Sequence, residues 1–115
     1  MHLPIAVEPE TKLQYFIDRI LPMHRRTVFP VARDKQLYGI FLLADMKKIA
    51  REDWDKTAVR QIMLPIATEH FVEIGTPLAE AYELMRVNGV GSVGVIDIEG
   101  KLVGFIQGSA NQRAR

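Results

Sequence analysis

Apolar residues recur at helical spacing in two stretches of the chain. In residues 11–21 they fall at Leu13, Phe16, Ile17 and Ile20. In residues 76–85 they fall at Leu78, Ala81, Tyr82 and Met85, in the same register. Spacings of three and four residues place side chains on one face of an α-helix. The pattern therefore predicts two equivalent amphipathic helices.

The residues around each stretch predict where the helices begin and end. Thr11 and Gln14 have the spacing of a capping box, and Pro22 is expected to end the first helix. Thr76 is the expected N-cap of the second helix. Pro77 then takes the first helical position, where a missing N–H costs nothing.

Short β-rich segments follow each helix in the same order. TVFPVA (27–32) and SVGVID (92–97) each predict a strand. Beyond the polar turns RDKQ and IEGK, LYGIF (37–41) and LVGFI (102–106) each predict a second strand. Both closing strands carry a glycine at the equivalent place, Gly39 and Gly104. The shared order of helix, strand, turn, strand and glycine indicates an internal repeat.

The remaining segments complete an α/β plan in which the order β-α-β-β-α is given twice. We expect helices at 44–52 and 57–63, and a strand at 71–74 whose weaker counterpart is 5–7. The repeats are taken as 1–64 and 65–115, with a truncated last helix. A helix on one face of so small a sheet leaves the other face exposed to solvent. The repeats are therefore expected to pack as one compact module with pseudo-twofold symmetry.

The stretch NGVGSVG (88–94) contains the letters of a dinucleotide-binding fingerprint, G-x-G-x-x-G. Such a loop binds pyrophosphate because it follows a strand and opens a helix. Here the order is reversed, because a helix ends near Val87 and the glycines lead into a strand. We interpret Asn88 and Gly89 as a helix C-cap and Gly91 as a turn residue. The motif therefore does not predict a dinucleotide enzyme.

Charge and composition remove several classes of function. Fifteen Lys and Arg against fourteen Asp and Glu leave a formal net charge of +1, too balanced for a nucleic-acid partner. The chain has no cysteine, and its histidines are scattered with no HExxH, so no catalytic residues and no metal site are predicted. The longest apolar run, 38–44, is far below the ~20 residues that span a bilayer. We expect a soluble, cytoplasmic region that does not insert into a membrane itself.

The doubled pattern resembles a tandem pair of CBS (cystathionine β-synthase) domains, also called a Bateman module. The resemblance covers residues 11–107 and rests on FPVARDKQLYGIF, VGVIDIEGKLVGFI, TPLAEAYELM and the connecting VRQIMLP. It implies a regulatory homodimer with two related clefts between its repeats. Such a module requires no cofactor. Its regulatory ligands are adenosyl compounds: AMP, ADP, ATP or S-adenosylmethionine.

The family pattern also implies which residues bind the ligand. A Ser or Thr three residues after the glycine contacts phosphate, and an Asp three residues further on binds the ribose hydroxyls. After Gly39 these positions are Leu42 and Asp45, and after Gly104 they are Gln107 and Ala110. The chain keeps one ribose-binding carboxylate, Asp45, and has no hydroxyl residue at either phosphate position. The resemblance therefore implies at most one working site per chain.

A strand motif adds further candidates to this site. It is intact as Phe29-Pro30-Val31 in the first repeat and altered to Val93-Gly94-Val95 in the second. We expect Phe29 and Val31 to lie in the core and to meet a ligand by backbone or edge. The candidate ligand-binding residues are Asp45, Phe29, Pro30, Val31, Leu42 and Gln107.

A narrower resemblance concerns the protein to which the module is attached. KLQYFIDRIL, the FPV strand and REDW…VRQIM are similar to the CBS pair of some site-2-type membrane zinc metalloproteases. This implies that the chain is the soluble regulatory region of such a protease. Ion channels, transporters and nucleotide enzymes are the alternative effectors.

Two functions follow from these observations. In the first, the module binds an adenosyl ligand and passes a conformational change to an attached effector domain; Asp45 and the FPV strand favour it. In the alternative, a ligand-free module provides dimerisation or scaffolding within a larger membrane protein. Leu42, Gln107 and Ala110 favour this alternative.

Five side chains are assigned roles from their setting in the sequence. Asp45 is also placed to stabilise a helix start. Trp54 is expected to be a packing or dimer anchor, and Met63 and Met85 are expected in the interior. His70 precedes a strand and is expected to be exposed.

Overall fold

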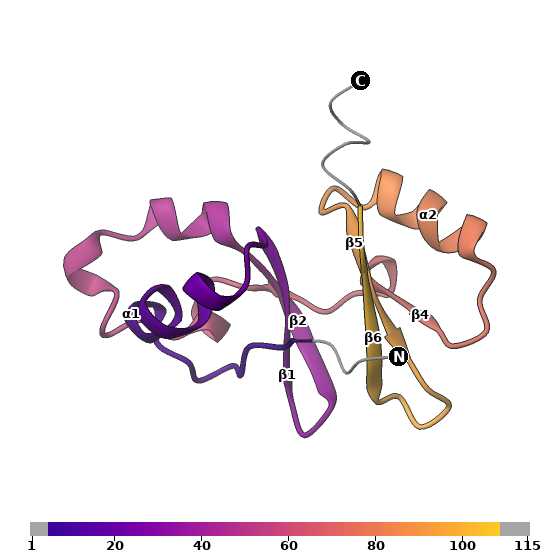
Figure 1. Ribbon diagram of the computed structural model, residues 1–115, viewed down its shortest axis with the longest axis horizontal. Helices are drawn as coiled ribbons and strands as arrows, with labels where there is room; N and C mark the ends of the chain where they lie inside the picture. Colours follow the sequence, from indigo (N-terminus) through magenta and orange to yellow (C-terminus); the bar gives the residue numbers. More distant parts are fainter. Residues whose placement is uncertain (1–4, 109–115) are drawn as a thin grey trace. The chain divides into compact units, whose positions relative to one another are not determined.

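The computed structural model describes residues 5–108 and divides the chain into two α/β units, Ile5–Ile66 and a second that begins at Ala67 (Figure 1). Each unit contains one three-stranded sheet. The predicted α/β class is therefore confirmed. Within the described residues, no helix combines the length and apolarity needed to cross a bilayer.

The sheet of the first half is antiparallel throughout. β1 (Val28–Arg33) pairs with β2 (Gln36–Leu42), and β2 pairs with the short β3 (Leu64–Pro65). Asp34 and Lys35 turn between β1 and β2 with φ values of 51° and 67°. Positive φ at both central residues matches the twist of a two-residue hairpin.

The first predicted helix is helical from Leu13 to Met23 but is not a regular α-helix. It begins as α1 (Leu13–Tyr15), continues as the π turn η1 (Phe16–Ile20) and ends as the 3₁₀ turn η2 (Leu21–Met23). The N–H of Leu21 donates to the carbonyl of Phe16, five residues back. Pro22 follows and has no N–H, so it does not continue this ladder.

The predicted capping box at Thr11 is wrong, because no side chain caps this helix. The N–H of Leu13 donates to the carbonyl of Thr57 at 2.9 Å, and the N–H of Gln14 donates to the carbonyl of Trp54 at 3.0 Å. The first-turn donors are therefore satisfied by a segment some forty residues away (57 − 13 = 44).

Aromatic side chains form the centre of the first core. The ring of Phe16 meets the rings of Phe29 and Phe41 edge to face, with centroids 5.0 Å apart in each pair. All three are fully buried. The other buried members of this cluster are Val7, Leu13, Val31, Met46 and Val59.

The sheet of the second half mixes both strand directions. β4 (Phe71–Glu73) pairs parallel with β5 (Ser92–Ile96), and β5 pairs antiparallel with β6 (Leu102–Gln107). α2 (Leu78–Val87) connects β4 to β5. Its core is small: Ala81, Met85 and Val93 are buried, with Val72, Leu84 and Ile106 packed against them.

The predicted cap of α2 is also wrong. Pro77 is the N-cap, and no side chain accepts from the first-turn N–H groups. The predicted C-terminus is confirmed, because Asn88 is the C-cap and Gly89 follows with φ of 85°. Gly91 also has a positive φ, 73°, as expected of a turn residue.

The two hairpins share one register, which supports the internal repeat. Val31 pairs with Gly39 in the first hairpin, and Val95 pairs with Gly104 in the second. Each hairpin then has a register shift directly after that valine. Equivalent residues can therefore be compared pair by pair.

The predicted strand at 5–7 is reduced to a single parallel bridge between Val7 and Val31. The N–H of Val7 donates to the carbonyl of Pro30, and the N–H of Ala32 donates to the carbonyl of Val7, both at 2.9 Å. The next bond of a parallel ladder would need the N–H of residue 30. Because Pro30 has none, the pairing cannot extend back toward Ile5.

The segment between the two hairpins differs most from its prediction. The expected helix at 44–52 is two 3₁₀ turns, η3 (Leu43–Lys48) and η4 (Arg51–Asp53). The expected helix at 57–63 is the single turn η5 (Val59–Gln61), and β3 was not predicted. A Cβ at Gly39 would lie 2.4 Å from the carbonyl oxygen of Leu64, so the pairing of β2 with β3 requires glycine there.

Candidate functional site

The FPV strand lies in the interior of the first half. Phe29, Pro30 and Val31 are fully buried, and Phe29 and Val31 belong to the aromatic core cluster. The carbonyl of Pro30 already accepts from Val7. The core role expected of Phe29 and Val31 is confirmed, and contact with a ligand through these three side chains would need the unit to open.

Leu42 and Asp45 lie within one turn of each other at the end of β2. Leu42 pairs with Val28, and Asp45 stands in the first turn of η3. The carboxylate of Asp45 is 3.1 Å from the ammonium of Lys48, and the Asp45 side chain is only 16% exposed. The Lys48 side chain is 77% exposed. The site therefore presents a largely sheltered carboxylate whose partner is a solvent-exposed lysine.

Asp45 stands in the first turn of η3, as its expected helix-start role requires, although it does not cap that turn by a hydrogen bond. Leu42 is the N-cap of η3, and no side chain caps this turn. Asp45 instead forms an ion pair with a residue three positions on, an interaction the sequence analysis missed. The spacing i, i+3 between an Asp and a Lys is the signal that could have found it.

Gln107 occupies the position equivalent to Leu42, at the end of β6. It pairs with Ser92, as Leu42 pairs with Val28. Gln107 belongs to the other unit. Its expected companion, Ala110, lies outside the described residues.

Two backbone N–H groups of the glycine-rich loop, residues 88–94, are hydrogen-bonded within the loop. The Asn88 side-chain oxygen accepts from the N–H of Val90 at 3.0 Å and from that of Gly91 at 3.1 Å. The Asn88 amide nitrogen donates to the carbonyls of Glu69 and Ser92. Because Val90 and Gly91 are already bonded, the loop does not offer their donors to a phosphate. The sequence analysis missed this role of Asn88, although Asn at a helix C-cap before two glycines is a recognisable signal.

The predicted exposure of His70 is wrong. Its side chain is buried, and its Nδ1 accepts from the N–H of Ala67 at 3.1 Å. His70 ends the 3₁₀ turn η6 (Thr68–His70), which folds the imidazole back over its own start. The local turn therefore accounts for the burial of this side chain.

Trp54 takes the predicted packing role. Its indole N–H donates to the carbonyl of Ile49 at 3.0 Å, and the ring packs against the first core. The Arg51 guanidinium lies 5.3 Å from the ring centroid. Met63 is partly buried and Met85 is buried, as expected.

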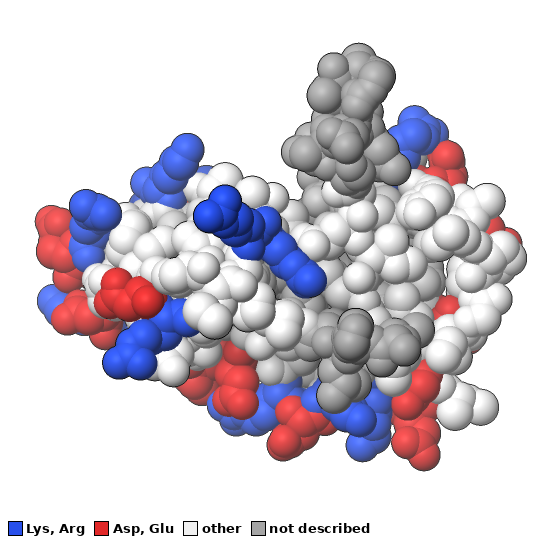
Figure 2. All heavy atoms as spheres, viewed as in Figure 1, with Lys and Arg blue, Asp and Glu red and all other residues white. Residues whose placement is uncertain are grey.

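Charges are distributed without a strong bias. On the face that Figure 2 shows, Lys and Arg lie interspersed with Asp and Glu. In the part of the chain that the structure describes, no three His, Asp or Glu side chains are grouped so as to hold a metal ion. Leu42, Asp45 and Lys48 lie together in one turn and stay the candidate ligand site.

Comparison with known proteins gives a family match over the second half of the chain. The sequence model of the CBS domain family matches residues 59–106, which are therefore similar to a CBS domain. This CBS match begins within the last residues of the first compact unit, which ends at Ile66.

Solved CBS structures share the fold of almost the whole chain. The CBS domain of the bacterial CNNM/CorC family Mg²⁺ transporter, in complex with ATP, is similar with a TM-score of 0.78 and 22% identity. That match covers 90% of this chain and 72% of the transporter domain. The CBS-pair protein CBSX2 from Arabidopsis thaliana is similar with a TM-score of 0.74 and 23% identity, over 97% of this chain and 88% of that one.

A curated relative contains a matching region within a longer chain. Inosine-5'-monophosphate dehydrogenase from Aquifex aeolicus (strain VF5) is 29% identical over 106 residues. The match covers 90% of this chain and spans only 21% of the dehydrogenase. The similarity therefore concerns one region of that enzyme.

Proposed function

We propose that the chain is a regulatory CBS module that binds an adenosyl ligand at Asp45 and modulates an attached effector domain. The observation that carries this proposal is the sheltered Asp45 carboxylate, at the family's ribose position and paired only with the exposed Lys48 among the described residues. Support also comes from the similar transporter CBS domain, whose structure contains ATP.

The ion pair of Asp45 is compatible with ligand exchange. Ion pairs with an exposed partner contribute roughly 0–1 kcal/mol, so ribose hydroxyls can replace the lysine at little cost. A carboxylate accepts hydrogen bonds from two hydroxyls at once. Lys48, once displaced, supplies a positive charge beside the ligand. AMP, ADP, ATP and S-adenosylmethionine are the candidate ligands.

Regulation further requires that the ligand distinguish two arrangements of the module. A ligand with equal affinity for both arrangements shifts neither population. We propose that the repeats, taken as 1–64 and 65–115, change their arrangement when the ligand binds.

Thermal unfolding with each of the four ligands tests this function. A ligand at one hundred times its dissociation constant adds about 2.7 kcal/mol of stability. We expect Asp45→Ala to abolish the thermal shift, because the ribose loses its acceptor. Lys48→Ala should still show a shift, but the shift should be smaller for ligands that carry more phosphates. A shift that survives Asp45→Ala would place the ligand elsewhere, and no shift with any ligand would favour the alternative function.

The alternative is a ligand-free dimerisation or scaffolding module. The specific observation in its favour is that Leu42 and Gln107 stand where the family pattern has a hydroxyl. In both proposals the chain forms a homodimer, which light scattering over a concentration series measures. A dimer that is insensitive to all four ligands would support scaffolding.

The effector is proposed to be a further domain of the same protein, and we place the module in the cytoplasm. The narrower sequence resemblance favours a site-2-type membrane zinc metalloprotease. A dehydrogenase or a transporter, the proteins in which similar regions occur, is the competing effector. The parent gene decides between them: the protease requires an apolar multi-helix region with HExxH.

A further inference from the structure

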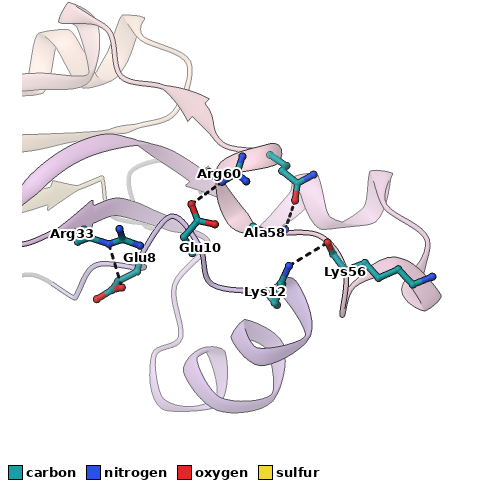
Figure 3. Close-up of polar contacts among 8 residues, drawn as sticks. Glu8, Glu10, Lys12, Arg33, Lys56, Ala58 and Arg60 are labelled. Atoms are coloured by element: carbon teal, nitrogen blue, oxygen red, sulfur yellow. Dashed lines mark hydrogen bonds and ion pairs between the residues drawn. The ribbon is translucent and has the colours of Figure 1, made fainter.

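Two arginines of the first unit, Arg25 and Arg26, differ from the others in having no partner. The remaining arginines of this unit each meet an acidic or aromatic side chain, in the pairs Arg33–Glu8 and Arg60–Glu10 (Figure 3), Arg19–Tyr15 and Arg51–Trp54. Within residues 5–108, no acidic group or ring is paired with the side chains of Arg25 and Arg26. Arg25 is exposed and Arg26 is half-buried. Because a guanidinium stays charged in proteins, this surface presents two uncompensated positive charges.

Three acidic residues of the same unit also have no ion pair. Glu52, Asp53 and Asp55 are exposed, and none of their carboxylates pairs with a basic group in the part of the chain that the structure describes. Arg51, the nearest arginine in the sequence, lies over the ring of Trp54, 5.3 Å from its centroid. The unit therefore carries an unpaired anionic set, residues 52–55, as well as the unpaired arginines.

These two sets lie at opposite ends of the helical segment Leu13–Met23. The acidic set is joined to the beginning of the segment, because the N–H of Gln14 donates to the carbonyl of Trp54 at 3.0 Å. The arginines come directly after His24, the C-cap of its last turn, η2. At about 1.5 Å per residue, the segment places the two sets roughly 15 Å apart.

The exposed side of this segment combines apolar and charged groups. Tyr15 is 55% exposed and Met23 is 74% exposed, the largest value for a large hydrophobic residue of this unit. Asp18 and Arg19 lie between them and are exposed as well. Spacings of three and four residues place these four side chains, here called the outer face, on one side of the helical segment. The outer face is therefore an apolar surface with a charge of each sign at its middle.

We propose that two copies of the chain associate through the outer face, with their helical segments antiparallel about a twofold axis. This arrangement sets the arginines of each copy against the acidic set of the other. At the middle, Asp18 of one copy meets Arg19 of the other. Met23 covers Tyr15 across the axis, a favourable contact between sulfur and an aromatic ring. The inference rests on the homodimer of the proposed function and assigns its contact surface.

Other occupants match only part of this surface. An acidic polypeptide or an anionic lipid surface would attract Arg25 and Arg26, but the acidic set at the other end of the segment would repel it. A surface with opposite charges at its two ends is complementary to a copy of itself turned end for end. This self-complementarity favours a second copy of the chain.

Charge exchange between copies tests the proposal. Sedimentation over a concentration series should show a dimer that weakens as salt is raised, because exposed charges are screened. Arg25→Glu with Arg26→Glu, and Glu52→Lys with Asp55→Lys, should each weaken the dimer about tenfold, or ~1.4 kcal/mol, because like charges then face each other. An equimolar mixture of the two variants should dimerise again, since opposite charges face each other in the mixed pair.

A matched control separates local pairing from overall charge. Lys35→Glu with Lys101→Glu makes the same change in net charge as the arginine variant. Both lysines are exposed, and neither forms an ion pair with a residue between 5 and 108. This control should dimerise as the parent does. Circular dichroism should show that every variant is folded, and the recovery of the mixture checks this independently.

Cysteine cross-linking tests the direction of the pairing, since the parent chain has no cysteine. Antiparallel segments bring position 15 of one copy to position 23 of the other. Tyr15→Cys mixed with Met23→Cys should therefore form a disulfide between chains under mild oxidation, and neither variant should do so alone. Cross-linking of each variant with itself, without the mixed product, would show parallel segments and overturn the proposal.

Two further outcomes would overturn it. If the chain stays monomeric over the whole concentration series, the homodimer of the proposed function fails together with this surface. If the chain dimerises but both charge variants dimerise as tightly as the parent, the homodimer stands and its contact surface lies elsewhere.

Discussion

The two halves of the chain share a hairpin register but differ in the side chains that form their cores. Phe16, Phe29 and Phe41 meet at the centre of the first half. At the equivalent places the second half has Ala81, Val93 and Ile106. The same hairpin register is therefore compatible with a large aromatic core and with a small aliphatic one, because backbone pairing does not depend on side-chain volume.

The segment that follows β2 is a second difference between the halves. In the first half, residues 43–65 pass over the helix and add β3 to the sheet. In the second half, α2 is held mainly by Ala81 and Met85. The first half therefore has the larger buried core of the two.

The largest expected effect comes from the matched leucines of the two helices. Leu13→Ala should cost about 2–5 kcal/mol, as deletion of a buried leucine does, whereas Leu78→Ala should cost about 0.5 kcal/mol or less. Urea unfolding followed by circular dichroism measures both, and the single tryptophan, Trp54, reports on the first half. Equal costs would show that the two faces are equally covered in solution.

An intermediate effect is expected at Asn88, which has no counterpart in the first half. Asn88→Ala removes the side chain that joins η6, the glycine loop and β5, and should cost about 1–3 kcal/mol. Asn88→Asp is the matched control, since it keeps the acceptor and loses the donors, and it should cost less. A neutral Asn88→Ala would mean that the glycines alone fix this loop.

The smallest effect concerns the exposed pair Glu83 and Arg86 on α2. A hydrogen bond from Arg86 and its positive charge lower the pKa of Glu83, and the pair raises the pKa of Arg86. Since the folded pKa of Glu83 is depressed, its contribution is present above the unfolded pKa and is lost as pH falls through the folded value. A helix signal followed in acid should show a small loss that Glu83→Gln lacks. An identical titration of both chains would contradict the pair.

Short-range patterns predicted much of the fold. Helical spacing located both helices, and alternating β-rich segments located the hairpins. Gly89 at a helix end with φ of 85° follows from chemistry that a sequence displays, since glycine alone adopts that conformation without cost. The order of elements, with a helix before the glycine loop and a strand after it, also showed that the loop is not a dinucleotide fingerprint.

The candidate site was predicted in part. The family resemblance named Asp45, and the structure places it in a sheltered turn, but its pairing with Lys48 depends on how η3 folds. Phe29 and Val31 were placed correctly in the core, and their burial, together with that of Pro30, removes these side chains from the site. His70 was missed because its burial arises from one tight turn.

By itself, the sequence determined the α/β class and the doubled order of helix and hairpin, because these depend on periodicity within ten or so residues. It did not determine the core fully, since Leu78 and Tyr82 of the predicted apolar face are exposed. Only the tertiary structure decided how each helix begins. The donors of Leu13 find carbonyls in a distant segment, and those of Leu78 find none among the described residues. A helix end is satisfied by whichever acceptor the fold brings near, and that acceptor is not encoded in the neighbouring residues.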